Sequence, residues 1–328
     1  MFADKFKDYI GTDYATTVTN GTVALHLALI TLGIGPGDEV IVPSFTYIAS
    51  ANAVKYTGAD VVFADSLEDS WQIDPDDIER KISNSTRAIM AVHLYGHPCN
   101  MERIMKIAEK HNLFVIEDCA EAIGSEYKGK KVGSFGDIAS FSFFGNKTIT
   151  CGEGGMVLTN NRLLFEKASN LKNQGVSEHK EYWHDVVGYN YRMTNIAAAI
   201  GLAQFEQIDG FIDRKIEIAH MYEKGLQDLP IKIHESIGDV KHTYWMVSIR
   251  CYKAGDRDQL RKFLAENGIE TRPTFYPAHT MPVYSGRYQK LPVAEKLGIS
   301  GINLPSYPGL VDNEIEYICE KIHEFYSK

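Results

Sequence analysis

The sequence contains no uninterrupted apolar stretch long enough to cross a bilayer. Its first residues, MFADKFKDYIG, are charged and therefore unlike a signal peptide. An excess of positive charge is also absent, because 34 lysines and arginines stand against 43 aspartates and glutamates, a formal net charge of −9. We therefore expect a cytoplasmic protein with neither a membrane nor a nucleic acid as partner, which must bind any phosphate through local groups.

Paired cysteines are missing as well. The five cysteines are odd in number, widely spaced and without a C-x-x-C motif, which favours reduced, buried thiols over a disulfide framework or a zinc site. The sequence has no internal repeat and no low-complexity linker. With 328 residues, 44% of them hydrophobic, the chain can bury a large core, and its length predicts a large domain with a smaller one beside it.

Short apolar runs alternate with segments of helical periodicity along the first half of the chain. The runs, several of them rich in β-branched residues, are 39–43, 61–65, 88–96 and 113–120, and the helical candidates between them include 75–82 and 100–111. This alternation is typical of βα units on a mainly parallel sheet, which places ligands at the carboxyl ends of its strands. We predict an α/β fold.

A second pattern follows this α/β region. A strand at 156–160 is followed by helical segments at 163–172, 195–207 and 211–229, and from about residue 242 a strand, a helix and a Pro-rich loop form another unit. We predict a large domain over residues 1–209 and a small C-terminal α+β domain over 210–328, packed tightly enough to close a cleft.

Three stretches carry side chains suited to chemistry. In TNGTVALHLAL, Gly21 lets the backbone turn and Thr22 can cap an apolar helix, whose first N–H groups form an anion site. In VIEDCAEAIG, Asp118 ends a strand at the ligand edge of the sheet and could pair with a cationic ring nitrogen, a metal or an arginine. In SFSFFGNKTITCGEGG, Lys147 lies between phenylalanines and glycines, where burial would lower its pKa and leave a nucleophilic amine.

Each stretch alone also fits an ordinary structural role: a capped helix, an ion pair and a surface lysine. Their combination describes a site for pyridoxal 5'-phosphate (PLP). In such a site the aspartate keeps the pyridine nitrogen protonated and the lysine holds the aldehyde as a Schiff base.

The chain resembles the DegT/DnrJ/EryC1/StrS sugar aminotransferases, a family of PLP enzymes of fold type I. The resemblance extends over nearly the whole sequence and includes GDEVIVPSFTYIASANAV, HLYGHPCNME, the segment from VIEDCAEAIG to GGMVLTN, and GYNYRMTNIAAAIGLAQ. Three stretches, FSFFGNKTIT, YWHDVVGYNYRMTNI and RPTFYPAHTMPVY, resemble members that transfer an amino group from L-glutamate to C4 of GDP-4-keto-6-deoxymannose, in O-antigen biosynthesis.

The resemblance implies roles for individual residues. Lys147 matches the Schiff-base lysine, which also carries protons, and Asp118 matches the partner of the pyridinium nitrogen. Glu121 occupies the place of a polar residue near the phenolic oxygen, and Tyr47 that of an aromatic ring stacked on the cofactor.

The remaining matches concern the phosphate, the partner subunit and the sugar nucleotide. Gly21, Thr22 and Ser142 match phosphate-binding positions, and Asn190 matches an asparagine that reaches the phosphate from the other subunit of a homodimer. Four side chains lie in segments that line the substrate cleft in similar enzymes: His184, Arg192, Tyr276 and His279. Family members carry a further N-terminal stretch ahead of a segment like FADKFKDYIGTDYA, so we expect either a shortened chain or a pocket that lacks part of its wall.

Other functions are compatible with parts of the sequence. A metal-dependent hydrolase or lyase could use His93 and His97 with Asp118. A related PLP-dependent sugar dehydratase would carry histidine in place of Lys147, and a non-catalytic sensor of cofactor or sugar nucleotide would need no reaction. A nicotinamide dehydrogenase is disfavoured because GIGPG follows a helix and lacks the G-x-G-x-x-G spacing.

Overall fold

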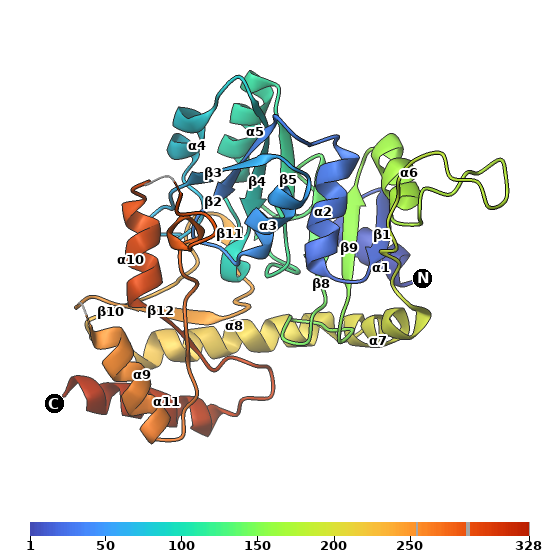
Figure 1. The fold of residues 1–328 in the computed structure, drawn as a ribbon. Coiled ribbons are helices and arrows are strands. Elements are labelled where there is room, and N and C mark those ends of the chain that lie inside the picture. The colour runs from blue at the N-terminus through green and yellow to red at the C-terminus, as the bar shows by residue number, and fades with distance from the viewer. Residues whose placement is uncertain (254, 287–288, 328) are drawn as a thin grey trace.

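A seven-stranded sheet forms the centre of the protein in the computed structural model, which describes residues 1–253, 255–286 and 289–327 (Figure 1). The strands lie in the order β1-β9-β8-β5-β4-β2-β3. Their bounds are β1 Tyr14–Val18, β2 Glu39–Pro43, β3 Asp60–Ala64, β4 Thr86–Val92, β5 Phe114–Asp118, β8 Ile138–Ser142 and β9 Gly155–Thr159. Strands β3, β2, β4, β5 and β8 are parallel, and β9 runs antiparallel to both β8 and β1.

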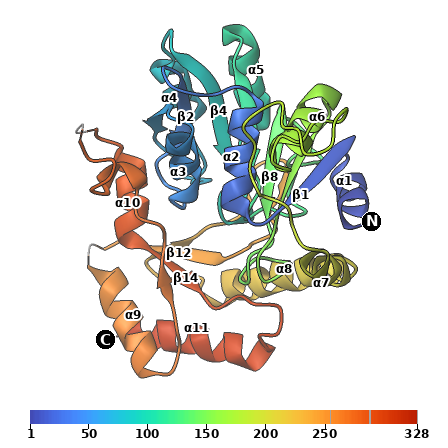
Figure 2. The same ribbon diagram turned by 45° about the vertical axis from the view of Figure 1, so that its right-hand side comes forward.

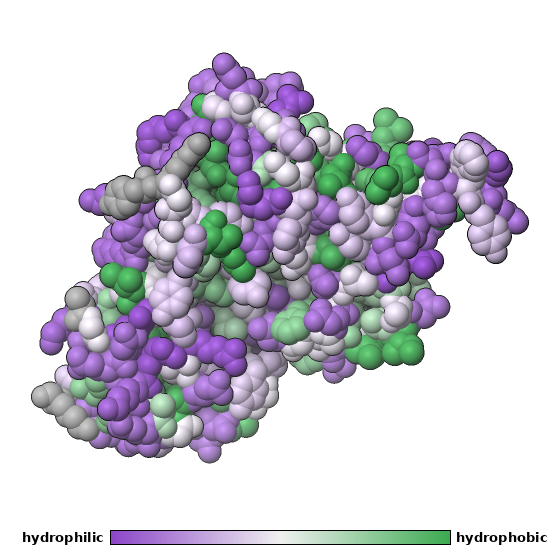
Figure 3. Space-filling model, viewed as in Figure 1, coloured by the Kyte–Doolittle hydropathy of each residue, from purple (hydrophilic) through white to green (hydrophobic). Residues whose placement is uncertain are grey.

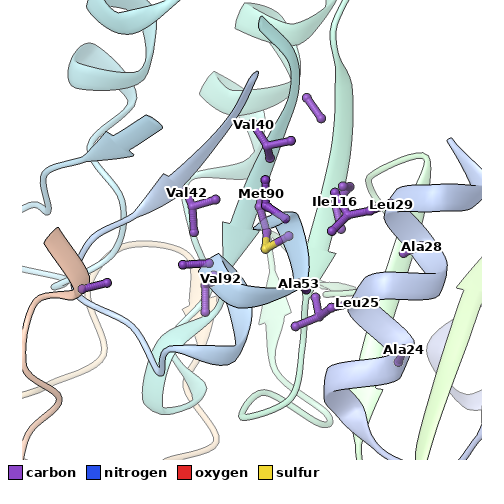
Figure 4. Close-up of a cluster of buried hydrophobic side chains, with 14 of the residues drawn as sticks. Ala24, Leu25, Ala28, Leu29, Val40, Val42, Ala53, Met90, Val92 and Ile116 are labelled. Carbon is purple, nitrogen blue, oxygen red and sulfur yellow. The ribbon is translucent and has the colours of Figure 1, made fainter. Parts of the chain in front are cut away.

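Helices cover both faces of this sheet because the central strands are apolar on both sides. In β2, Val40 and Val42 contribute to a core shared with α2 (Gly21–Thr31) and α3 (Ala49–Tyr56), which Figure 4 shows in part. Between them, Ile41 faces the opposite core, shared with α4 (Pro75–Lys81) and α5 (Met101–His111). The alternation fixes the register of the sheet, since a slip of one residue would exchange the two faces.

The α1 helix (Phe2–Ile10) supports the end of the sheet that carries β8. Phe6 packs edge to face on Phe141 and Phe143, with ring centroids 5.0 and 5.2 Å apart, and Phe2 lies 5.2 Å from Phe143. The phenylalanines before Lys147 therefore anchor the loop that carries this lysine. Two further helices, α6 (Arg162–Leu171) and α7 (Asn195–Phe205), follow β9, and the chain between them projects from the body at the right of Figure 1.

The C-terminal part has its own sheet and core, on the lower side of the molecule in Figures 1 and 2. Its strands lie in the order β10-β12-β14-β13, with β10 Ile231–Ile233, β12 Val247–Cys251, β13 Arg272–Pro273 and β14 Gly301–Leu304. The helices are α9 Asp256–Glu266, α10 Pro292–Ser300 and α11 Asp312–Tyr326. Its β11 (Val240–Lys241) instead joins β6 (Glu126–Tyr127) and β7 (Lys130–Lys131) of the first part in a three-stranded sheet.

One helix belongs to both parts. Helix α8 (Ile208–Gly225) contributes Ile208 and Ile212 to the core around α1, and Ile218 and Tyr222 to the core of the C-terminal unit. A division after residue 209, which we propose from the sequence, therefore falls in the first turn of a continuous helix.

Most predicted elements of the α/β region lie within a few residues of the observed ones, and all five cysteines are buried and free, as predicted. No helix among the described residues is long and apolar enough to span a membrane. Hydrophobic residues on the face shown in Figure 3 lie in scattered small groups, one of them at the lower right where Figure 1 places α7.

Candidate active site

Lys147 lies in the loop between β8 and β9, with 12% of its side chain exposed. Its Nζ atom is 3.7 Å from Oε1 of Glu121 and 4.0 Å from the centroid of the Trp245 ring. Burial lowers the pKa of Lys147, and the nearby Glu121 and Asp118 carboxyls oppose this shift. The site thus favours a neutral, nucleophilic amine more than water does.

Glu121 is held next to this amine by the backbone of an unusual turn. Its Oε2 atom accepts a hydrogen bond of 2.9 Å from the N–H of Tyr95, a residue with a φ of 57°. Burial raises the pKa of Glu121 to about 7, although Lys147 lowers it. Glu121 can therefore exchange a proton near neutral pH, at a position within reach of Lys147.

Asp118 ends β5 at the carboxyl edge of the sheet, as predicted. Its Oδ2 atom accepts a hydrogen bond of 2.8 Å from the Ser50 hydroxyl, and its Oδ1 atom accepts one of 3.1 Å from the N–H of Ala120. Burial raises the pKa of Asp118, while these donors and Lys147 lower it. The side chain is a buried acceptor that a cationic group would stabilise.

The start of α2 lies directly against the end of β8. A Cβ atom on Gly21 would lie 2.7 Å from Cβ of Ser142, and one on Gly155 would lie 2.4 Å from the carbonyl oxygen of Asn20. The prediction that Thr22 caps the helix is wrong, because Asn20 is the N-cap. Its side chain accepts a hydrogen bond of 3.0 Å from the N–H of Val23. The first N–H groups of α2, those of Gly21 and Thr22, have no partner inside the helix and can bind an anion.

The glycine at the helix start has a different role from the expected one. Gly21 is not among the residues with positive φ, so it is not needed for a turn; it is needed because the Ser142 side chain is so close. Gly155, one of the glycines after Lys147, does allow close approach of backbone, since a Cβ atom on it would lie 2.4 Å from the carbonyl oxygen of Asn20.

Aromatic side chains form one side of the site. The Tyr47 side chain, 57% exposed, has its ring centroid 5.6 Å from that of Phe275. Phe275 stacks on Tyr95 at 5.4 Å, and Tyr95 on Trp245 at 6.2 Å. The exposed face of Tyr47 is thus available to a flat ligand, whereas Tyr95 and Trp245 are buried beneath Lys147 and Glu121.

The histidines considered for a metal centre have other partners. The Nε2 atom of His93 lies 3.1 Å from the Glu117 carboxyl, and its Nδ1 atom accepts a hydrogen bond of 3.0 Å from the N–H of Cys99. Glu117 also accepts from three backbone N–H groups, and His97 bonds to the Pro98 carbonyl and the Ile237 N–H. Although His93, Glu117 and Cys119 are close enough for one ion, the protein itself satisfies His93 and Glu117. His97 and Asp118 are not part of that group, so the predicted ligand set does not form.

Three of the predicted residues lie on the projecting segment, residues 172–194. Asn190 and Arg192 are exposed, and exposed His184 uses Nδ1 to contact the carbonyl of Gln174 at 2.9 Å. Within the described chain, no hydrogen bond, ion pair or ring contact joins these three side chains to Lys147. Their proposed roles therefore depend on a second subunit or on a ligand.

The last two predicted substrate residues differ from each other. Tyr276 is 49% exposed, with the Arg257 guanidinium 5.8 Å from its ring centroid. His279, in contrast, is buried, with Nδ1 2.6 Å from the Ser44 hydroxyl and Nε2 3.3 Å from Glu295. Both ring nitrogens of His279 thus have partners within the described chain, and its contact with a substrate stays a prediction.

Sequence reasoning missed Ser50, Tyr95 and Trp245. Each is brought to the site by a contact between distant segments, and no local motif distinguishes these residues from other core residues. Hints existed for Ser50 and Tyr95, because the stretches GDEVIVPSFTYIASANAV and HLYGHPCNME contain them.

The comparison with protein families agrees with this geometry. The model of the DegT/DnrJ/EryC1/StrS aminotransferase family matches residues 1–323. The chain belongs to this family. A curated family relative, GDP-perosamine synthase of Escherichia coli O157:H7, is 62% identical over 326 residues, which cover 99% of this chain and 89% of the relative.

Solved structures of aminotransferases share the fold. The crystal structure of S. venezuelae DesV in complex with a ketimine intermediate has a TM-score of 0.95 at 36% identity, covering 100% of this chain and 88% of the other. The PLP form of the putative sugar aminotransferase Spr1654 from Streptococcus pneumoniae has a TM-score of 0.93 at 28% identity, covering 99% and 89%. The α/β architecture predicted from the sequence is therefore confirmed as that of this aminotransferase family.

Proposed function

We propose that this protein is a PLP-dependent aminotransferase that moves an amino group from L-glutamate to C4 of GDP-4-keto-6-deoxy-D-mannose, which gives GDP-perosamine. The observation that carries the proposal is the placement of Lys147, a lysine with a lowered pKa beside Glu121, in a chain 62% identical to a GDP-perosamine synthase. The product would serve O-antigen synthesis, and the enzyme would work in the cytoplasm.

The residues present fit PLP. The start of α2, closed against Ser142 so tightly that a Cβ on Gly21 would clash, offers N–H groups and a hydroxyl to a phosphate. Asp118 is a buried acceptor to which no cationic group of the described residues donates a hydrogen bond, which suits a protonated ring nitrogen. When bound, PLP would supply an aldehyde group that carries the amino group from glutamate to the keto sugar and a ring that withdraws electrons.

The chain itself would hold the cofactor and move protons. Lys147 would bind the aldehyde through Nζ, and its lowered pKa keeps the amine able to accept a proton. Glu121, with a pKa raised to about 7, would hold or release a proton next to that amine. Tyr47 would cover one face of the ring, since it is exposed beside Phe275.

We propose a homodimer with shared sites as the working assembly. It is supported by large exposed side chains on the projecting segment, among them Tyr182 at 97% and Val187 at 87%, and by Ile196 at 76% at the start of α7. These residues flank Asn190 in sequence, so a subunit packed on them would bring Asn190 to an interface. Light scattering coupled to size-exclusion chromatography should give twice the 36.8 kDa chain mass, and a monomer at micromolar concentration would contradict the dimer.

The substrate assignment is tested by mass spectrometry of reactions that contain PLP, L-glutamate and one keto sugar nucleotide. We expect amine incorporation into GDP-4-keto-6-deoxymannose, and none with Lys147→Ala. Efficient amination of a UDP- or dTDP-linked keto sugar in its place would show another sugar aminotransferase, and loss of the C3 hydroxyl would show a dehydratase. Cofactor binding without any turnover would favour a non-catalytic sensor.

A further inference from the structure

A cavity of about 660 Å³ lies in the C-terminal unit, next to the candidate active site. Its wall includes the α8 residue Lys215 and the segment 303–307, which begins in β14 and continues past its end, with Arg272 and Glu314 at other points. Asn146 and Trp245 line it as well. The cavity therefore borders both the residue before Lys147 and the ring that lies over the Lys147 amine.

Lys215 is the unusual group in this wall. The residue is only 5% exposed. Its Nζ atom donates hydrogen bonds to the carbonyls of Trp245 at 3.0 Å and Ser306 at 2.9 Å. An ammonium has three N–H donors, so one remains after these two bonds. Within the described chain, no carboxylate lies within ion-pair distance of Lys215.

The other charges around the cavity already have partners. Arg272 is exposed and lies 3.3 Å from Glu270, while Glu314 accepts a hydrogen bond from the N–H of Val311 at the start of α11. Burial alone lowers the pKa of Lys215 to about 8, since no neighbouring charge offsets it. Lys215 is thus a buried cation whose charged form the protein stabilises only through two carbonyl groups.

Trp245 connects this cation to the candidate active site. Its carbonyl accepts a hydrogen bond from Lys215, and the centroid of its ring lies 4.0 Å from the Lys147 amine. Its Nε1 atom donates a hydrogen bond of 2.8 Å to the carbonyl of Asn146. Trp245 therefore contacts both Lys215 in the wall of the cavity and Lys147 in the candidate active site.

We propose that this cavity binds a carboxylate group of the amino donor, with Lys215 as its cationic anchor. The proposal rests on the function proposed above, which supplies a dicarboxylate as donor. A phosphate of the sugar nucleotide has the same anionic chemistry, so the test must distinguish the two sources.

The test is calorimetric titration of the PLP-loaded protein at pH 8 with 2-oxoglutarate, in two buffers of different ionisation enthalpy. Because burial lowers the pKa of Lys215 to about 8, binding of an anion beside it should take up part of a proton at this pH. Lys215→Arg should bind without this proton uptake, because an arginine is always charged. Lys215→Met should bind roughly 10- to 100-fold more weakly, as expected for loss of a charged hydrogen bond.

Controls separate the possible outcomes. Lys321→Met removes a half-buried lysine of α11 that is paired with Glu324 outside the cavity, and should bind like the wild type. If Lys215→Met does not fold, the wild type and Lys215→Arg still decide through their proton uptake. Unchanged binding and proton uptake in the Lys215 variants would overturn the proposal, and so would Lys215-dependent binding of inorganic phosphate or GDP but not of 2-oxoglutarate.

The same titration without PLP, beside the absorption spectrum of the loaded protein, distinguishes this proposal from the function on which it rests. A normal PLP spectrum with Lys215-independent 2-oxoglutarate binding contradicts only the cavity site. Absence of a Lys147-dependent spectrum contradicts the proposed function, whether or not Lys215 binds a carboxylate.

Discussion

At the scale of single residues, Asp118 has the most clearly defined environment in the candidate site. It is buried at the end of β5, where one hydroxyl and one N–H donate to its carboxyl, and burial raises its pKa. A positively charged ring nitrogen would add the interaction that favours the carboxylate. The negative charge of Asp118 should therefore matter for holding the cofactor more than its size does.

Asp118→Asn, which keeps the shape and removes the charge, should weaken PLP binding roughly 10- to 100-fold, the range of a lost charge-assisted hydrogen bond. Equilibrium titration of the cofactor, followed by absorption, measures this. Asp8→Asn, which changes an exposed side chain of α1, is the control and should bind PLP as the wild type does. Equal affinity of Asp118→Asn and wild type would remove Asp118 from the site.

At the scale of elements, the contact between α2 and β8 determines the shape of the proposed phosphate site. Gly21 begins the helix, Ser142 ends the strand, and the space between them leaves no room for a side chain at position 21. The same contact positions the N–H groups of the first turn. Packing and ligand binding thus depend on one glycine.

Gly21→Ala should destabilise the fold by about 1–3 kcal/mol, the usual cost of overpacking, and should also weaken PLP binding. Urea unfolding measures the first effect. Gly210→Ala is a matched helix substitution, because a Cβ there meets nothing within 4 Å; it should be neutral or stabilise by up to about 1 kcal/mol. If both variants have wild-type stability and cofactor affinity, the close contact is not functionally important.

The sequence predicts the elements of the fold better than the contacts between them, and the reason is physical. Strands such as β2 and β5 are predicted because their apolar runs are local, and Asp118 and Lys147 are found because their positions relative to these strands are local as well. Ser50 reaches Asp118 across 68 residues, and the Lys147 amine lies over the ring of Trp245, which belongs to the core shared with α2 and α3. Such partners follow from packing of whole layers, which a single sequence does not reveal without the fold.

At the scale of the whole molecule, three buried histidines connect the two parts of the chain. His97 follows β4, His234 follows β10, and His242 follows β11; their ring centroids lie 4.9–5.4 Å apart. Burial lowers the pKa of His97 to about 4 and of His234 to about 3, and holds that of His242 well below its usual value. The positive charge of Lys232 adds to this effect on His234.

Acid should therefore destabilise this junction. The unfolded histidines bind protons near pH 6.5 and the folded ones do not, so the free energy of unfolding falls as the pH drops below 6.5. Between pH 6.5 and 5 we expect a loss of about 1.5 kcal/mol for each of His97 and His234, and a further loss from His242. Chemical unfolding at a series of pH values measures the slope.

His234→Phe keeps a ring to stack on Trp71, which lies 4.4 Å away, but cannot be protonated, so its stability should depend less steeply on pH. His179→Phe, at an exposed position outside the cluster, serves as the control for a change of histidine to phenylalanine. A slope in His234→Phe as steep as in the wild type would contradict a contribution of the cluster.

The central claim is that Lys147 is the residue that binds and uses the cofactor. The most direct measurement is the absorption spectrum of the purified chain with PLP, before and after L-glutamate, beside Lys147→Ala. We predict a visible band of lysine-bound cofactor in the wild type, its conversion to the pyridoxamine form by glutamate, and neither in Lys147→Ala. A wild-type spectrum that is the same as that of Lys147→Ala, with or without glutamate, would contradict the account.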